Sequence, residues 1–121
     1  MSLDLALAAA RAATAKTLEE TVVLDVGPLI AITDYFVVTG GRNDRQVRAV
    51  VDEVQHAMRR AGGRLLRREG HDDARWVLLD YGDVVVHVLH AEARAYYGLE
   101  RLWADAGRVA FDHDLDYAAR S

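Results

Sequence analysis

The sequence predicts a single α/β (α+β) domain in which helices cover one mixed β-sheet of about five strands. Short β-branched runs alternate loosely with helical patterns along the chain, which favours one sheet with helices packed on it. Two of these runs flank Tyr81-Gly82-Asp83, a tight turn that indicates an antiparallel hairpin. The 121 residues have room for one hydrophobic core.

The first element is expected to be a helix from Ser2 to about Glu20. This segment is rich in Ala and Leu, contains no Gly or Pro, and repeats its apolar residues at helical spacing. Ser2 is placed to cap the helix. Two β-branched runs follow, residues 21–26 and 35–39, and each stops at a glycine-containing pair, so both are predicted strands.

The second helix has the clearest pattern. Its apolar residues step by three and four from Val47 to Ala61, while arginines and acids occupy the other face. Asn43 or Asp44 can cap its start. Gly62-Gly63 favours its end, because glycine tolerates the left-handed conformation just past a helix.

The second half of the domain begins with a short, charged segment around Leu65-Leu66 that is typical of an edge strand. The hairpin, residues 76–89, is the most hydrophobic part of the chain. A helical pattern then covers residues 91–106 and is interrupted at Gly98. Its predicted apolar stripe is Tyr96, Leu99, Leu102 and Trp103.

The domain is therefore expected to span residues 1–106. Residues 107–121 have sparse apolar content and scattered acids, which predicts an acidic, flexible tail. The absence of cysteine excludes disulfide scaffolds and thiolate sites and suits a reducing cytoplasm. Because no apolar run approaches the roughly twenty residues that span a bilayer, we expect a cytoplasmic protein that does not bind membranes.

The net charge of −4 argues against a protein whose main task is nucleic-acid binding, and we expect no sequence-specific nucleic-acid partner. The charge is uneven, however. Residues 42–75 hold nine arginines against six acids, a net charge of +3. This stretch is more readily a solvated helix face than a contact with RNA in a large RNA complex, and both interpretations stay open.

Acids and histidines in the hairpin do not form a recognisable catalytic or metal site. His87 and His90 are three apart on a predicted strand, so they point to opposite faces and cannot share a metal ion. Asp80 and Asp83 could act as paired carboxylates, but hydrogen bonding within the turn is the favoured interpretation. The common nucleophile, zinc and phosphate-loop motifs are missing. We therefore expect no catalytic residue, no cofactor and no metal.

Trp76 is more informative because it follows a charged loop at the entrance of the hairpin. It could be a core residue or a partly exposed binding residue, and position alone favours neither. Tryptophan and tyrosine dominate binding hot spots. Together with Tyr81 and His87, Trp76 predicts a protein-binding patch.

Several segments share their residues, order and spacing with one family. The hairpin reads Trp76-Val-Leu-Leu-Asp-Tyr-Gly-Asp-Val-Val-Val-His-Val, and the helical pattern after it reads Arg94-x-Tyr-Tyr-x-Leu-Glu-Arg-Leu-Trp-x-Asp-Ala106. Upstream lie Ile32-Thr-Asp-Tyr-Phe-Val-Val-Thr-Gly40, Arg45-Gln-Val47 and Glu69-Gly70. Over about residues 5–106 the chain resembles the ribosomal silencing factor family, also called Iojap-related.

The resemblance implies a nucleotidyltransferase-like topology and a translation repressor. Such a protein binds the large ribosomal subunit through ribosomal protein L-fourteen and blocks association with the small subunit when nutrients are short. The resemblance also implies a homodimer in the free state. The partner-binding residues that it carries over are Trp76, Asp80, Tyr81, Asp83 and His87, with Arg45 as a further candidate.

The alternative is a nucleotidyltransferase-like enzyme that acts on a nucleotide or an RNA end. Thr39-Gly40-Gly41 could mimic the glycine turn of such enzymes. The Asp-x-Asp pair is missing at the expected place, since Arg42-Asn43-Asp44-Arg45 follows the turn. Two-metal phosphoryl chemistry needs those carboxylates to hold its magnesium ions, so the sequence predicts a protein that is not an enzyme.

Overall fold

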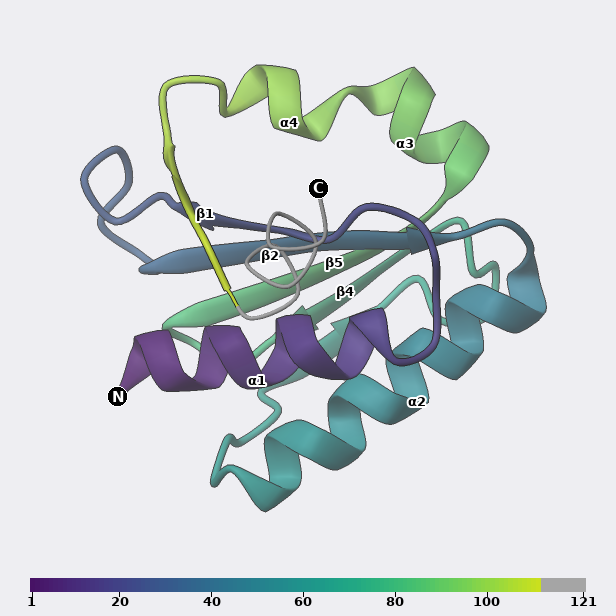
Figure 1. Cartoon of the computed structure of the whole chain (residues 1–121), viewed down its shortest axis with the longest axis horizontal. Helices are drawn as coiled ribbons and strands as arrows, with labels where there is room; N and C mark the ends of the chain where they lie inside the picture. Colours follow the sequence, from purple (N-terminus) through teal and green to yellow (C-terminus); the bar gives the residue numbers. More distant parts are fainter. Residues whose placement is uncertain (112–121) are drawn as a thin grey trace, which may run out of the picture.

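Six strands form one mixed sheet, with two helices on each face (Figure 1). The computed structural model describes residues 1–111. In chain order the elements are α1 (Ser2–Thr14), β1 (Val22–Asp25), β2 (Tyr35–Gly41), α2 (Asp44–Arg60), β3 (Arg67–Glu69), β4 (Trp76–Asp80), β5 (Val84–His90), α3 (Ala91–Tyr97), α4 (Leu99–Leu102) and β6 (Gly107–Val109).

The sheet has the strand order β3-β4-β5-β2-β1-β6. The central pair, β2 and β5, is parallel, and every other neighbouring pair is antiparallel. In the predicted hairpin, Trp76 is opposite Leu89 and Asp80 is opposite Val85. The predicted α+β architecture with one mixed sheet is therefore confirmed.

Helices α1 and α2 pack together on one face of the sheet, where small alanines of α1 allow close approach to the valines of α2. Helix α2 matches its prediction: the Asn43 side chain accepts a hydrogen bond from the backbone N–H of Gln46 at 2.8 Å, and Gly62 follows the helix with φ +88°. Among residues 1–111, no helix is long and apolar enough to cross a membrane.

Helix α1 is shorter than predicted, because it ends at Thr14 rather than near Glu20. The Thr17 hydroxyl accepts a hydrogen bond from the backbone N–H of Glu19 at 3.1 Å, a local bond that competes with helical hydrogen bonding. The residue before the helix is Met1, which supplies no side-chain cap, so the predicted capping role of Ser2 is wrong.

Two adjacent glycines allow the backbones of β2, β5 and α2 to come close together. A Cβ atom on Gly40 would lie 2.6 Å from the carbonyl oxygen of Leu89, and one on Gly41 would lie 2.8 Å from the backbone nitrogen of Val47. A side chain at either position would clash with these backbone atoms, so both positions require glycine. The Thr39-Gly40-Gly41 segment therefore has a packing role at the point where β2 passes into α2.

Residues 107–111 do not form the flexible tail that their composition predicts. β6 pairs with β1 in antiparallel register, with Val109 opposite Val23, and Phe111 is 2% exposed in the core beneath α1 and α2. The sheet therefore has six strands rather than five. The spacing of Val109 and Phe111 puts both side chains on the same face of an extended chain, so two apolar residues suffice to anchor this segment. The rest of the predicted tail, residues 112–121, lies outside the described residues.

If Phe111 closes the core, Phe111→Ala should lower the free energy of unfolding by about 3–5 kcal/mol, because it leaves a large cavity. Urea unfolding measures this loss. Leu18→Ala is the control: Leu18 is 99% exposed, so its loss should change stability by no more than about 0.5 kcal/mol. Wild-type stability in the Phe111→Ala variant would contradict the packing of residues 107–111.

Candidate protein-binding surface

Strand β4 turns one row of side chains toward α1 and α2 and the other row toward the face that carries α3 and α4. Val77 and Leu79 of the first row are fully buried. Trp76, Leu78 and Asp80 of the second row are only half-buried, as is Val85 opposite Asp80 on β5. We call these four residues the open sheet face. They form a part of the sheet that the helices leave accessible.

Aromatic rings connect the open sheet face to helix α3. In order, Phe36, His87, Trp76, Tyr97 and Tyr96 form a continuous series, with successive ring centroids 4.7, 5.9, 5.0 and 5.1 Å apart. We call this series the aromatic ladder. It runs from a buried end, where Phe36 is 9% exposed, to a solvent end, where Tyr96 is 80% exposed. Large amphipathic rings held in this way are the residue types that dominate protein-binding hot spots.

The sequence placed Tyr96 and Leu102 on the buried stripe of their helical pattern, and the structure corrects this. Both are exposed, whereas Leu99 is buried and Trp103 is half-buried. The reason is Gly98, whose left-handed conformation (φ +58°) ends α3 before α4 begins. The two helices are therefore out of helical register with each other. A single helical periodicity therefore cannot assign both segments. Tyr96 and Tyr97 are surface residues that the sequence pattern did not identify as candidates for binding.

His87 lies beneath Trp76 rather than at the surface. It is 5% exposed, and its Nδ1 accepts a hydrogen bond from the indole N–H of Trp76 at 3.1 Å. Burial lowers the pKa of His87 from its ordinary value of 6.5 to about 4, so the ring is neutral at pH 7. Because Nδ1 accepts, the proton of the neutral ring is on Nε2. The predicted partner-binding residue His87 is therefore covered in this structure, and its ring supports that of Trp76.

The loop before Trp76 is folded tightly against it. Gly70 has φ +81°, and a Cβ atom there would overlap the carbonyl oxygen of Trp76, so the position requires glycine. Between this loop and α3 lies a cleft of about 480 Å³. It is lined by Gly70, Asp73, Arg75, Trp76, Ala93, Tyr96 and Tyr97. The cleft extends the accessible aromatic surface from the sheet to α3.

Of the two hairpin acids, Asp80 uses its side chain within the turn. One Asp80 carboxylate oxygen accepts a hydrogen bond from the backbone N–H of Gly82 at 2.8 Å, and the other lies 3.8 Å from the Arg67 guanidinium. Asp83 is exposed, and its backbone carbonyl accepts hydrogen bonds from the segment that enters β2. The favoured interpretation of Asp80 as a turn residue is confirmed. Both carboxylates also lie at the end of the hairpin farther from Trp76.

Tyr81 and Arg45 do not adjoin Trp76 on the open sheet face. Tyr81 is half-buried on the opposite face, packed against the core beneath α1 and α2, so the predicted grouping of Trp76, Tyr81 and His87 is wrong for Tyr81. Desolvation raises the pKa of Tyr81, and the nearby Arg59 charge lowers it to a smaller extent. Arg45 is exposed in the first turn of α2. That helix starts at the end of the sheet that also holds Trp76, since Gly40 pairs with Leu89 and Leu89 pairs with Trp76.

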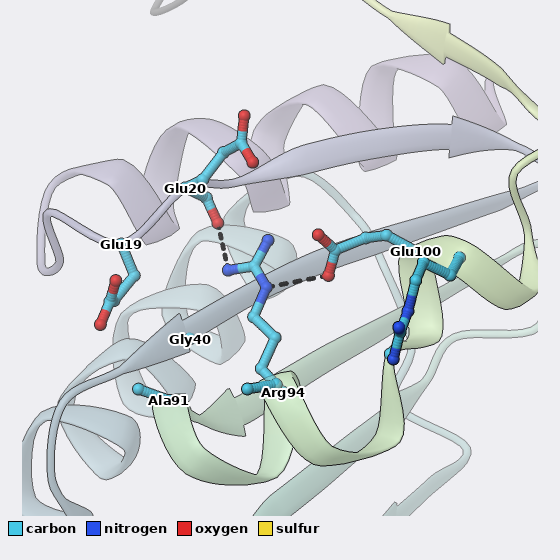
Figure 2. A pocket seen from close by; sticks show the side chains of 9 residues that line it. Glu19, Glu20, Gly40, Ala91, Arg94 and Glu100 are labelled. Carbon is cyan, nitrogen blue, oxygen red and sulfur yellow. Dashed lines mark hydrogen bonds and ion pairs between the residues drawn. The ribbon is translucent and has the colours of Figure 1, made fainter.

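A second cavity, of about 460 Å³, lies on the other side of α3 and surrounds Arg94 (Figure 2). The Arg94 Nε–H donates to the Glu100 carboxylate at 2.9 Å, and another guanidinium nitrogen donates to the backbone carbonyl of Glu20. Arg94 therefore ties α3 to α4 and to the segment before β1.

Among residues 1–111, no group of three or more His, Asp or Glu side chains is arranged to hold a metal ion. His90 accepts a hydrogen bond from the backbone N–H of Glu92 at the start of α3. It points away from His87, as the strand alternation predicts.

Known proteins share both the sequence and the fold. The chain matches the family described as "ribosomal silencing factor during starvation" over residues 1–121. The ribosomal silencing factor RsfS of Bacillus subtilis is 41% identical over 108 residues, 89% of this chain and 92% of that protein. The one from Halalkalibacterium halodurans is 42% identical over 97 residues, 80% of this chain and 83% of that protein. A crystal structure of a Chromobacterium violaceum protein matches with a TM-score of 0.82 and 32% identity, covering 92% of each chain.

The buried, neutral His87 predicts a pH-dependent stability. Between pH 6.5 and pH 4 the unfolded chain binds a proton at His87 that the folded chain does not, so the free energy of unfolding should fall as the pH falls through this window. The loss from this group is about 3 kcal/mol by pH 4. Urea unfolding at a series of pH values measures it.

Other groups also titrate in this range, so the informative quantity is a difference between variants. His87→Asn keeps an acceptor for the Trp76 N–H and should show a shallower fall with pH than the wild type. His56→Asn changes an exposed histidine of α2, and its free energy of unfolding should fall with pH as that of the wild type does. Parallel curves for all three proteins would show that His87 is accessible to protons in the folded state.

Proposed function

The chain belongs to the ribosomal silencing factor family, and from this membership we propose that it represses translation in the cytoplasm at the level of the ribosome. It binds the large ribosomal subunit through ribosomal protein L-fourteen. By occupying that surface it blocks association with the small subunit, especially under nutrient limitation. The observation that carries the proposal is the accessible aromatic surface, formed by the open sheet face and the solvent end of the aromatic ladder.

This surface has the physical properties of a protein contact. Trp76 is half-buried and held by the hydrogen bond to His87 and by the ring of Tyr97, so little side-chain entropy is lost when a partner covers it. Leu78 and Val85 add apolar area at the centre, and Asp80 supplies a charge at its margin. An apolar centre with a polar rim is typical of specific protein interfaces.

Within this contact we assign different roles to the candidate residues. Trp76 is the central anchor, Asp80 and Asp83 lie at the hairpin end, and Arg45 lies at the margin near the start of α2. His87 acts through Trp76. Tyr81 supports the hairpin from the opposite face and lies outside the centre of the contact.

The free protein forms a homodimer through the same surface. Tyr96, Tyr97 and Leu102 are 80%, 50% and 74% exposed on the consecutive helices α3 and α4, and association would cover this apolar area. If one surface serves both purposes, the dimer and the ribosome complex exclude each other, and the ribosomal partner converts dimer to monomer.

The enzymatic alternative has no specific observation in its favour. Thr39 uses its hydroxyl in a buried hydrogen bond of 2.8 Å with the Thr21 hydroxyl, and the glycines after it serve the close approach of β5 and α2. The turn that resembles a transferase motif is thus accounted for by packing, and the protein acts by binding.

Co-sedimentation with isolated ribosomal subunits tests the function directly. The protein should pellet with large subunits and not with small subunits, and it should lower the fraction of subunits that associate into whole ribosomes. Equal binding to both subunits, or unchanged association at saturating protein, contradicts the proposal.

Truncation of Trp76 tests the contact. Trp76→Ala should weaken the affinity for the isolated ribosomal protein by about 2 kcal/mol or more, roughly 30-fold in Kd, as hot-spot truncations do. It should also shift dimer to monomer in light scattering. Trp76→Phe keeps a ring against Tyr97 but loses the N–H donor. Its affinity for the ribosomal protein should lie between those of Trp76→Ala and the wild type.

The control for this experiment is Leu18→Ala, which removes a 99% exposed leucine between α1 and β1. It should leave affinity and dimerisation unchanged. Urea unfolding of each variant establishes that the binding data come from folded protein. A folded Trp76→Ala variant with wild-type affinity would show that the contact lies elsewhere.

A further inference from the structure

Five arginines lie within ten residues at the end of α2 and the start of β3. We call Arg59, Arg60, Arg64, Arg67 and Arg68 the arginine corner. All five are exposed, and no acid occurs in the sequence between Val54 and Arg68. The whole chain has a net charge of −4, so this corner is a strong local departure from the charge of the protein.

The fold brings the corner to the edge of the sheet that adjoins the open sheet face. After α2 the chain reverses at Gly62, and the N–H of Gly63 donates to the carbonyl oxygen of Met58 at 2.8 Å. β3 then pairs with β4, with Arg67 opposite Asp80. In Figure 1 the chain leaves α2 at the end of the helix farthest from the sheet and then runs back toward the sheet. Arg67 therefore lies beside Asp80 at the border of the open sheet face, and the other four arginines continue the corner around this edge of the sheet toward α2.

The protein's own acids compensate only part of this charge. Arg67 lies 3.3 Å from the Glu69 carboxylate and 3.8 Å from that of Asp80. Arg68 donates to the neutral side chain of Gln55 at 3.1 Å. Within residues 1–111, no ion pair joins Arg59, Arg60 or Arg64 to an acid. The partial negative charge at the C-terminal end of α2 favours the positive charges of Arg59 and Arg60. It does not explain Arg64, which lies beyond the helix.

We propose that the arginine corner binds backbone phosphates of ribosomal RNA beside the protein contact on the large subunit. The inference rests on the proposed function, because the ribosome supplies a partner surface rich in RNA phosphate. Exposed guanidinium groups match phosphate geometry and gain affinity by releasing counterions. Phosphate contacts of this kind carry no sequence information, and they orient the bound protein. An acidic chain would otherwise be repelled from such a surface.

The test compares two double variants of the full chain. Arg60→Gln with Arg64→Gln removes two charges of the corner that no acid pairs with among the described residues. Arg101→Gln with Arg108→Gln removes two exposed arginines at α4 and β6 and keeps the same net charge as the first variant. Affinity for isolated large subunits is measured between 50 and 200 mM salt, and affinity for the isolated ribosomal protein is measured in parallel.

The corner variant should lose about 1.5 from the slope of log affinity against log salt, since each phosphate contact contributes about 0.7–0.9. Its deficit relative to the wild type should therefore be about eightfold larger at 50 mM than at 200 mM salt. Its affinity for the isolated ribosomal protein should equal that of the wild type. The control variant should keep the wild-type slope on subunits.

A wild-type slope in the corner variant overturns the inference, and so does an equal loss against the isolated ribosomal protein, which would indicate an acidic protein contact instead. Failure of the proposed partner gives a different result: the wild type binds subunits but not the isolated ribosomal protein, and the slopes on subunits still decide the role of the corner. A wild type that binds no subunit overturns both proposals.

Discussion

The parallel pairing of β2 with β5 is the constraint on which the rest of the structure depends. Seven residue pairs join these two strands, and because the strands are parallel both end at the same edge of the sheet. The helix that follows each strand turns to a different face, α2 to one side and α3 to the other. The hairpin strand β4 then lies outside β5, and β1 lies outside β2. The position of Trp76 near the start of α3 follows from this arrangement.

The parts of the fold that could be predicted from sequence are those with a strong local signal. Helix α2 combines an apolar step of three and four with an Asn43 cap and a glycine end, and the hairpin combines two apolar runs with a glycine turn. β6 has no such signal, because its place depends on an otherwise unpaired edge of β1, which lies more than 80 residues earlier in the chain. The end of α1 is also decided by a competing bond, that of the Thr17 hydroxyl, rather than by composition.

The binding surface was predicted less completely than the fold, for the same kind of reason. Residue type identified Trp76, but its burial and its partner depend on which strand residues lie beside it across the sheet. Leu78 is opposite His87 and Trp76 is opposite Leu89, a register that puts the imidazole under the indole and that no sequence pattern contains. Tyr97 joins the aromatic ladder as the last residue of α3, through a contact with Trp76, which lies 21 positions earlier in the chain.

The two outermost strands determine how copies of this chain can meet. β3 and β6 have three residues each, and all three residues of β3 are exposed and charged. Strands this short are poor templates for adding a further strand, and the charges of β3 strengthen this effect at its edge, so both borders protect the protein against open-ended aggregation by backbone pairing. A copy that associates with this chain therefore meets it through side chains on a face of the sheet, and the hydrogen-bonded sheet stays confined to a single molecule.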